Sequence, residues 1–301
     1  MNKEAMFYEK ADDYINCNLC PHRCSKLKEG QKGICGVREV KKAEDGSLKL
    51  YSINYGEITS ISMDPIEKKP LYNFYPESII LSIGSFGCNF KCSFCHNYAI
   101  SQNRPKSKYI PPEEMAHISL EVLNNLGLAF TYNEPSIWYE YVYDVCRAIK
   151  TLDVNHKTVL VTNGFICEKP LKKLLPYVDA LNIDLKGNDQ YYKRLCFGAL
   201  KDIKNTIKIA NEMGCHVEVT TLLIPNENTD DETLKELGEF LGSINKNITL
   251  HLSRYFPRYK MDAPATPIDD MKKAYKYLSK YLNNIYLGNL TKEELEYCLE
   301  K

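Results

Sequence analysis

The chain has 301 residues, 44% of them hydrophobic, which is enough to bury a sizeable core in one large domain or two ordinary ones. Lys and Arg together number 39, as do Asp and Glu, so the formal charge is zero and nothing in it indicates a nucleic-acid or membrane-surface partner. The N-terminus has no apolar signal-peptide core, and no stretch approaches the roughly 20 apolar residues of a membrane span. We therefore expect a soluble, cytoplasmic protein.

The first 75 residues differ in composition from the rest, being rich in Cys, Lys, Gly and Tyr. A turn at EDGS separates two candidate strands, VREVKKA and LKLYSINYG. We expect residues 1–75 to form a small cysteine-rich subdomain that ends in the linker SMDPIEKKPLYNFYPES, and residues 76–301 to form a second, larger domain.

Four cysteines of the first region are spaced C-x2-C-x3-C-x10-C: Cys17, Cys20, Cys24 and Cys35. Tight grouping in a long chain without an export signal favours metal binding over disulfides. Four thiolates close a site completely, so zinc and a 4Fe-4S cluster both suit, and the spacing does not separate them. His22 lies between two of the cysteines, as a substitute ligand or as a neighbour of the site.

From residue 78 onward, short β-branched runs alternate with helix-length segments, which predicts an α/β fold with six βα units and a mostly parallel sheet. The candidate strands are SIILSIG, LGLAFTY, TVLVTNG, DALNIDLKG, HVEVTTLLIP and ITLHLSRY, with NNIYLGN as a closing or edge strand. The candidate helices lie near residues 112–125, 136–151, 168–176, 200–213, 230–242 and 267–282.

A second cysteine group, Cys88, Cys92 and Cys95, follows the first of these strands in GCNFKCSFCHNYAIS. A structural zinc site needs four protein ligands, whereas a 4Fe-4S cluster can leave its fourth iron to an outside ligand. The alternatives are a zinc loop completed by His96 and an electron-transfer cluster completed by another residue.

Polar residues also gather where four predicted strands end: Thr131, Asn133, Glu134, Thr162, Asn163, Asp184, Lys186, His251 and Arg254. Parallel α/β folds place their active sites at this rim. Ordinary turn and cap chemistry explains any one of these residues, but their recurrence on four strands favours a shared pocket.

The stretch from Cys88 to Cys95, with Phe94 before the last cysteine, resembles the signature of radical S-adenosylmethionine (SAM) enzymes. Further motifs extend the resemblance over nearly the whole chain, to the radical SAM enzymes of the AmmeMemoRadiSam system, relatives of pyruvate formate-lyase-activating enzyme: DPIEKKPLYNFYP, FTYNEPSIW, VTNGF, NIDLKG, VEVTTLLIPNEN and LHLSRYFPRYKM. The resemblance implies a partial (β/α)6 TIM-type barrel. It also implies that a 4Fe-4S cluster cleaves SAM to a 5′-deoxyadenosyl radical, which abstracts hydrogen from a substrate such as a polypeptide.

By the same resemblance, the cluster ligands are Cys88, Cys92 and Cys95. The implied SAM contacts are Phe94, Asn133, Glu134, Thr162, Asn163, Asp184 and Lys186, with His251 and Arg254 as further candidates. The chain departs from the family pattern at Phe256, where histidine is common, and it lacks a cysteine-rich C-terminal ribbon. Cys196, in KRLCFG, is a candidate catalytic thiol that interacts with a substrate radical, or else a packed cysteine.

The resemblance implies a reductant such as flavodoxin or ferredoxin, and a protein substrate or Memo- or AMMECR-type partners, with neither nucleic acid nor membrane involved. The N-terminal cysteines would hold a second metal site, either zinc or an auxiliary 4Fe-4S cluster. The competing hypothesis is a non-catalytic iron-sulfur or zinc protein in which both cysteine groups are structural.

Overall fold

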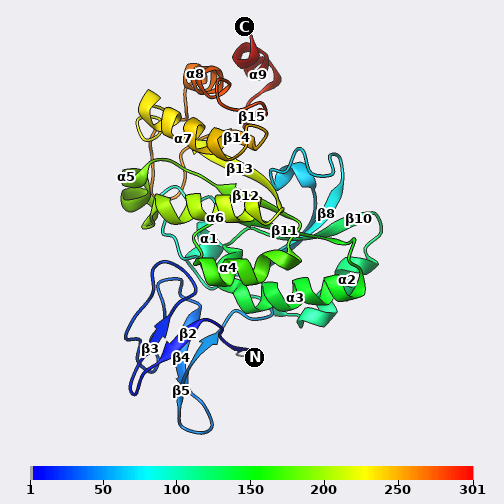
Figure 1. Ribbon diagram of the computed structural model, residues 1–301, viewed down its shortest axis with the longest axis vertical. Helices are drawn as coiled ribbons and strands as arrows, with labels where there is room; N and C mark the ends of the chain where they lie inside the picture. The colour runs from blue at the N-terminus through cyan, green and yellow to red at the C-terminus, as the bar shows by residue number, and fades with distance from the viewer. Residues whose placement is uncertain (1–2, 301) are drawn as a thin grey trace.

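The computed structural model describes residues 3–300. Its centre is an eight-stranded sheet in the order β15-β14-β13-β12-β11-β10-β8-β7, in which β7 pairs antiparallel with β8 and every other neighbouring pair is parallel (Figure 1). β7 and β15 stand at opposite ends of this order, so the sheet is an open, partial barrel, as expected. The strands are β7 (Ser60–Pro65), β8 (Ile79–Gly84), β10 (Asn125–Phe130), β11 (Lys157–Thr162), β12 (Ala180–Asp184), β13 (His216–Leu223), β14 (Thr249–Arg254) and β15 (Ile285–Gly288).

Helices follow the parallel strands in the predicted alternation. They are α1 (Tyr98–Ser101), α2 (Pro112–Glu121), α3 (Tyr139–Leu152), α4 (Glu168–Leu174), α5 (Asp189–Tyr191), α6 (Leu200–Glu212), α7 (Asp231–Ile244), α8 (Ile268–Leu278) and α9 (Lys292–Leu299). The longer ones pack on one face of the sheet, whereas α1 lies beside a cavity at the strand ends. The last helix, α9, was not predicted. Its signal is the capping box of Thr291 and Glu294, whose side chains bond each other's backbone N–H groups.

Residues 3–58 form a separate lobe, called here the N-terminal lobe, which lies at the foot of the barrel in Figure 1. It contains a three-stranded sheet and a hairpin, made of β1 (Lys3–Glu4), β5 (Leu48–Ser52) and β4 (Arg38–Lys42), and of β2 (Tyr8–Lys10) and β3 (Ile15–Cys17). The short strand β6 (Glu57–Ile58) at its end pairs with β9 (Lys108–Tyr109). The division of the chain at residue 75 stays a prediction, although β7 of the predicted linker belongs to the barrel sheet.

Residues 66–74 of the linker, which follow β7, pack on the concave face of the sheet. Side chains alternate along a strand, and Leu128 and Phe130 of β10 face the helices whereas Ala129 belongs to a different cluster. That second cluster joins linker and sheet and contains Ile66, Leu71, Phe74, Ile80, Ala129, Val159 and Ala180. The linker therefore fills the interior of the partial barrel and leaves the carboxyl ends of the parallel strands uncovered.

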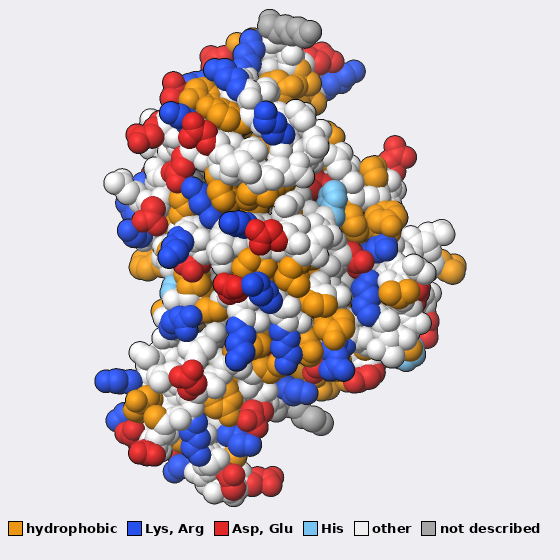
Figure 2. All heavy atoms as spheres, in the orientation of Figure 1, with side chains coloured by type: hydrophobic (Ala, Val, Ile, Leu, Met, Phe, Trp, Pro, Cys, Tyr) orange, Lys and Arg blue, Asp and Glu red, His pale blue; other side chains and the backbone are white. Residues whose placement is uncertain are grey.

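Both basic and acidic side chains are present over the face of the molecule in Figure 2. This agrees with the equal numbers of the two kinds in the sequence. Within residues 3–300, none of the helices combines the length and apolar character that crossing a membrane requires.

Candidate functional site: a three-cysteine cavity at the strand ends

A cavity of about 280 Å³ opens at the carboxyl ends of the parallel strands. The three cysteines that follow β8 lie on one side, and residues at the ends of β10, β11 and β12 form the other. The structure brings together in this cavity Cys88, Cys92, Cys95, Phe94, Asn133, Glu134, Thr162, Asn163, Asp184 and Lys186. Of the predicted SAM contacts, His251 and Arg254 are not among the residues that line it.

The loop that carries the three cysteines, residues 87–95, is called here the three-cysteine loop. It is tied to residues 192–196, a short π-helical turn, by two backbone bonds: Lys91 N–H donates to the Cys196 carbonyl at 3.1 Å and Ser93 N–H to the Leu195 carbonyl at 3.2 Å. These bonds flank Cys92 on both sides. The loop therefore has a defined backbone path before any ligand is considered.

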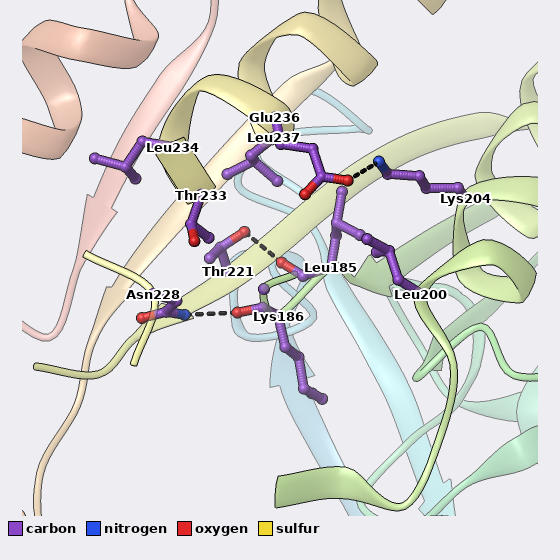
Figure 3. Close-up of a pocket in the computed structure, with 11 residues that line it drawn as sticks. Leu185, Lys186, Leu200, Lys204, Thr221, Asn228, Thr233, Leu234, Glu236 and Leu237 are labelled. Carbon is purple, nitrogen blue, oxygen red and sulfur yellow. Dashed lines mark hydrogen bonds and ion pairs between the residues drawn. The ribbon is translucent and has the colours of Figure 1, made fainter. Parts of the chain in front are cut away.

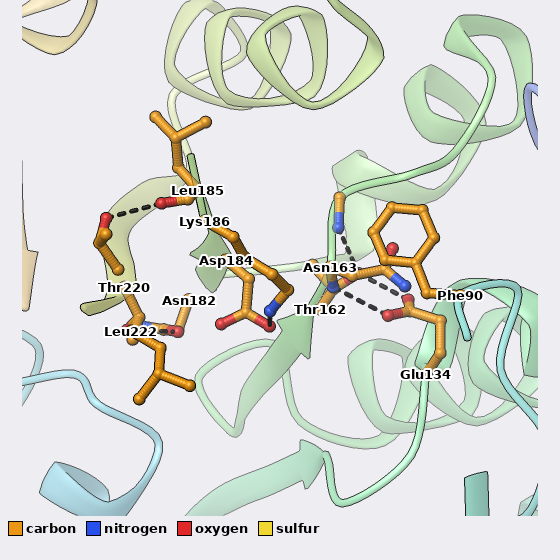
Figure 4. Close-up of polar contacts among 12 residues, drawn as sticks. Phe90, Glu134, Thr162, Asn163, Asn182, Asp184, Leu185, Lys186, Thr220 and Leu222 are labelled. Atoms are coloured by element: carbon orange, nitrogen blue, oxygen red, sulfur yellow. Dashed lines mark hydrogen bonds and ion pairs between the residues drawn. The ribbon is translucent and has the colours of Figure 1, made fainter. Parts of the chain in front are cut away.

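Glu134 joins the ends of β10 and β11 beneath the cavity (Figure 4). One carboxylate oxygen accepts bonds from the Ser136 N–H at 2.9 Å and the Thr162 hydroxyl at 2.6 Å, and the other accepts from the Asn163 N–H at 2.8 Å. Only 3% of Glu134 is exposed, and this burial raises its pKa although the hydrogen bonds oppose the shift. Glu134 therefore positions the neighbouring strand end.

Asn163 and Asn133 connect the strand ends to the three-cysteine loop and the segment before it by hydrogen bonds. The Asn163 amide donates to Asn89 Oδ1 at 2.8 Å and lies 3.7 Å from Cys88 Sγ. Asn133 Oδ1 accepts from the Ser85 N–H at 2.9 Å. The strand ends thus hold the loop at its first cysteine.

Lys186 and Asp184 form an ion pair at 2.5 Å on the cavity wall (Figure 4). Burial lowers the pKa of Lys186, but the Asp184 carboxylate, together with Cys92, Cys196 and Tyr192 nearby, outweighs burial, and the pKa of Lys186 is raised. The Lys186 carbonyl accepts from the Asn228 amide at 2.6 Å, beside a small void of about 10 Å³ behind the sheet. Figure 3 shows the Lys186 side chain pointing away from that void, so the backbone contacts aim its ammonium group at the cavity.

His251 and Arg254 lie elsewhere, although both belong to β14. His251 is 5% exposed and its Nε2 lies 2.6 Å from Glu218 Oε2, on the concave face where the linker packs. Arg254 lies at the end of the strand, where it pairs with Glu294 at 2.9 Å and lines a second cavity of about 610 Å³. This second cavity adjoins the first, and the two share Phe94, His96 and Leu222.

Cys196 is fully buried and lines neither cavity. Its thiol lies beside that of Cys92, and the interaction between the two thiols, together with burial, raises the pKa of Cys92 well above its ordinary value. The structure thus places Cys196 behind the three-cysteine loop.

The four N-terminal cysteines also lie near one another. Burial raises the pKa of Cys20, and the charges of Cys35, Cys17 and Cys24 raise it further. A Cβ built on Gly33 would lie 3.4 Å from Cys24 Sγ and 3.8 Å from Cys35 Sγ. In residues 3–300, no group of three or more His, Cys, Asp or Glu side chains is arranged to hold a single metal ion, so the metal content of both cysteine groups stays a prediction.

A polar network on the other side of the cavity was not predicted from the sequence. Asp64 accepts from Lys69 Nζ at 2.7 Å and from the Tyr132 hydroxyl at 2.6 Å, and Tyr132 lines the cavity. Burial raises the pKa of Asp64, but these bonds outweigh it and lower the pKa to about 2. The signal was present in the linker motif DPIEKK, in which Asp64 and Lys69 stand five residues apart.

The residues present fit an iron-sulfur cluster with one open iron. Three thiols from one loop face a single cavity, and on the same cavity lie Lys186 and the backbone around Asn163. Thiolates are the ligands such clusters require. The same cavity is lined by Asp184 and Lys186, which carry one negative and one positive charge.

Comparison with known proteins identifies the class that this fold and cavity define. The family model "Radical SAM superfamily" matches residues 82–241. An uncharacterized protein of Methanocaldococcus jannaschii is 39% identical over 98% of this chain and 88% of its own length. The chain therefore belongs to the radical SAM superfamily and is an enzyme of that superfamily.

A second relative and a solved structure agree with this assignment. A putative glycyl-radical enzyme activating enzyme of Methanocaldococcus jannaschii is 29% identical over 68% of this chain and 79% of its own length. The crystal structure of a radical SAM methyltransferase from Sphaerobacter thermophilus covers 90% of this chain and 76% of its own, with a TM-score of 0.56 and 16% identity. The resemblance to activating-enzyme relatives is thus confirmed, and the solved structure supports the fold.

Proposed function

We propose that the protein binds a 4Fe-4S cluster through Cys88, Cys92 and Cys95 and cleaves SAM reductively in the cavity at the strand ends. The observation that carries the proposal is the convergence of these three thiols with the ends of β10, β11 and β12 on one cavity. The chemistry supplied there is one-electron cleavage of SAM, which gives methionine and a 5′-deoxyadenosyl radical that abstracts hydrogen from the substrate.

The chain itself contributes binding and orientation. Lys186 presents a positive charge suited to the SAM carboxylate, and Asp184 presents a negative one suited to its amino group. Glu134, Thr162 and Asn163 keep the opposite wall in place through their mutual bonds. Phe94, with Asn133, completes the proposed contacts.

The second cavity extends the site and is the proposed place of the substrate. Because it shares Phe94, His96 and Leu222 with the first, a group bound there would lie beside the proposed SAM site. A relative is named as an activating enzyme of a glycyl-radical enzyme, which supports a polypeptide substrate and a protein reductant. Partners of the Memo or AMMECR type, and a metal at the N-terminal cysteines, belong to the same proposal.

The test is anaerobic reconstitution with iron and sulfide, followed by reduction in the presence of SAM. We expect the wild type to form 5′-deoxyadenosine, and the Cys92→Ala variant to lose this activity because one of three cluster ligands is missing. The matched control is Cys146→Ala, which removes a fully buried thiol from α3, away from the cavity. Cluster-loaded wild type that leaves SAM intact with a strong reductant would instead support the non-catalytic alternative.

A further inference from the structure

His22 connects the two cysteine groups of the molecule. It lies between Cys20 and Cys24 in the N-terminal lobe, and its Nε2 is 2.7 Å from the backbone carbonyl of Asn89. Asn89 directly follows Cys88, the first cysteine of the three-cysteine loop. A backbone carbonyl only accepts hydrogen bonds, so the imidazole is the donor and carries a proton on Nε2.

The His22 ring is held in place by its surroundings. It packs edge-on against Phe165, with ring centroids 5.0 Å apart, and Phe165 packs in turn against Phe90 of the three-cysteine loop at 5.0 Å. The Asn89 amide donates to the Phe165 carbonyl at 2.8 Å. The imidazole therefore belongs to a packed contact that includes two residues of the loop.

The N-terminal lobe contacts the start of the same loop at a second point. Gly87 has a φ of +88°, and a Cβ built on it would lie 2.9 Å from the Cys35 carbonyl and 2.5 Å from Val37 Cγ1. Only glycine tolerates so close an approach at this backbone conformation. The segment around Cys35 is therefore pressed against the residue that precedes Cys88.

We propose that His22 is a positioning residue for the cluster ligands, and that the four-cysteine site of the N-terminal lobe controls the three-cysteine loop through it. Cys17 and Cys20 precede His22 in the chain, and Cys24 and Cys35 follow it, so a metal held by these four cysteines would fix the backbone on both sides of His22. The imidazole then fixes the Asn89 carbonyl and, through it, the placement of Cys88. Filling the N-terminal site would thereby strengthen retention of the cluster at the three-cysteine loop, and by linkage the reverse would also hold.

The first test compares His22→Ala with His22→Gln, whose amide N–H can take the place of Nε2–H. One hydrogen bond is worth about 1 kcal/mol, so we expect the alanine variant to lose its cluster about fivefold faster in the presence of a chelator. The glutamine variant should recover most of this loss. His117→Ala, at an exposed position of α2, is the matched control and should behave as wild type.

Cluster loss is followed by the electron paramagnetic resonance signal of the reduced cluster that changes on SAM addition. An N-terminal cluster closed by four cysteines would not give this change. Equal rates of loss for wild type and His22→Ala would overturn the proposal.

The second test asks whether the N-terminal cysteines influence cluster retention through His22. We expect a variant with Cys17, Cys20, Cys24 and Cys35 all replaced by alanine to lose the SAM-responsive cluster faster, and adding His22→Ala should change the rate no further. Full additivity of the two changes would show that His22 acts independently of the N-terminal site and would overturn the coupling.

Because the inference rests on the proposed function for the identity of the cluster ligands, a readout independent of the cluster is also needed. Hydrogen exchange of the apo protein provides it, even for a variant that cannot be loaded. We expect faster exchange of the amides of residues 87–93 in His22→Ala than in His117→Ala. Unchanged exchange would overturn the positioning role, whereas absence of SAM cleavage by wild type would count against the proposed function alone.

Discussion

At the scale of single residues, the environment of Cys196 differs from that expected of a thiol that contacts a substrate radical. It is fully buried, and backbone bonds from Lys91 and Ser93 hold the turn that carries it against the loop on either side of Cys92. The thiol lies beside the thiol of Cys92. This position favours an effect on the cluster ligand over direct contact with the substrate.

We predict that Cys196→Ala makes the cluster harder to reduce. When Cys92 binds the cluster as a thiolate it has no proton to donate, so the neighbouring Cys196 thiol would be the donor. Hydrogen bonds to ligand sulfurs help set the potential of iron-sulfur clusters, and a donor favours the more negative, reduced state. Loss of about 1 kcal/mol corresponds to about 40 mV for a one-electron couple, so the midpoint potential should fall by that order. A redox titration followed by electron paramagnetic resonance measures it.

The control for this prediction is Cys146→Ala, because Cys146 is equally buried but lies in α3. Its midpoint potential should equal that of wild type. A Cys196→Ala potential that also equals wild type would remove the proposed effect on Cys92. Normal SAM cleavage combined with failure to form product would instead support the earlier hypothesis of a thiol acting on the substrate.

Much of the site was predictable because its residues follow strands whose carboxyl ends meet at one edge. Cysteine spacing and the strand-end positions of Glu134, Asn163 and Lys186 were sufficient to place them on a common cavity. The position of His251 was not predictable in this way, because it lies in the middle of its strand and faces the interior of the partial barrel. Its hydrogen-bond partner is Glu218 of β13, and Tyr72 of the linker packs against its ring with centroids 4.7 Å apart. No local pattern in the sequence reveals either contact.

At the scale of elements, that linker explains why β13 and β14 carry buried polar residues. Glu218 of β13 is fully buried and accepts bonds from the backbone N–H groups of Tyr72 and Asn73 at 3.0 and 2.8 Å. His216 and His251 lie 2.8 and 2.6 Å from the same carboxylate. One side chain thus joins the linker to two neighbouring strands.

We predict that Glu218 makes stability depend on pH. Burial raises its pKa, but bonds from His216, His251 and the linker outweigh this and lower the pKa to about 2 from an ordinary value of 4.5. A carboxyl whose pKa is lower in the folded state stabilises the fold fully above its unfolded pKa, and this contribution is lost as pH falls through the folded pKa. The window is therefore from about pH 4.5 down to about pH 2.

Glu218→Gln tests this contribution by removing the charge at nearly constant shape. Near pH 7 we expect the free energy of unfolding to fall by an amount on the order of 3 kcal/mol, and the difference from wild type to shrink as pH drops through that window. Urea unfolding at a series of pH values measures both. Glu121→Gln, at an exposed end of α2, should show neither effect. A pH-independent difference would contradict the electrostatic origin.

At the scale of the whole molecule, the N-terminal lobe and the barrel are joined by a buried ion pair. Arg38 of β4 lies 3.0 and 3.1 Å from the two carboxylate oxygens of Glu140 in α3, and each side chain is 1% exposed. The same carboxylate accepts from the Met6 N–H at 2.7 Å, and Arg38 also donates to the Met6 carbonyl. The pair therefore fixes the lobe from which His22 reaches the three-cysteine loop.

Because removal of one partner leaves the other charge buried and unpaired, Glu140→Ala should destabilise the protein by roughly 3–5 kcal/mol. Glu168→Ala breaks the exposed Glu168–Lys172 pair, which lies at 2.5 Å, and should cost about 0.5 kcal/mol or less. Denaturant unfolding compares the two variants, and similar small losses would show that Glu140 does not secure the lobe. If it does, hydrogen exchange in residues 87–93 should also rise in Glu140→Ala, since a displaced lobe withdraws His22 from Asn89.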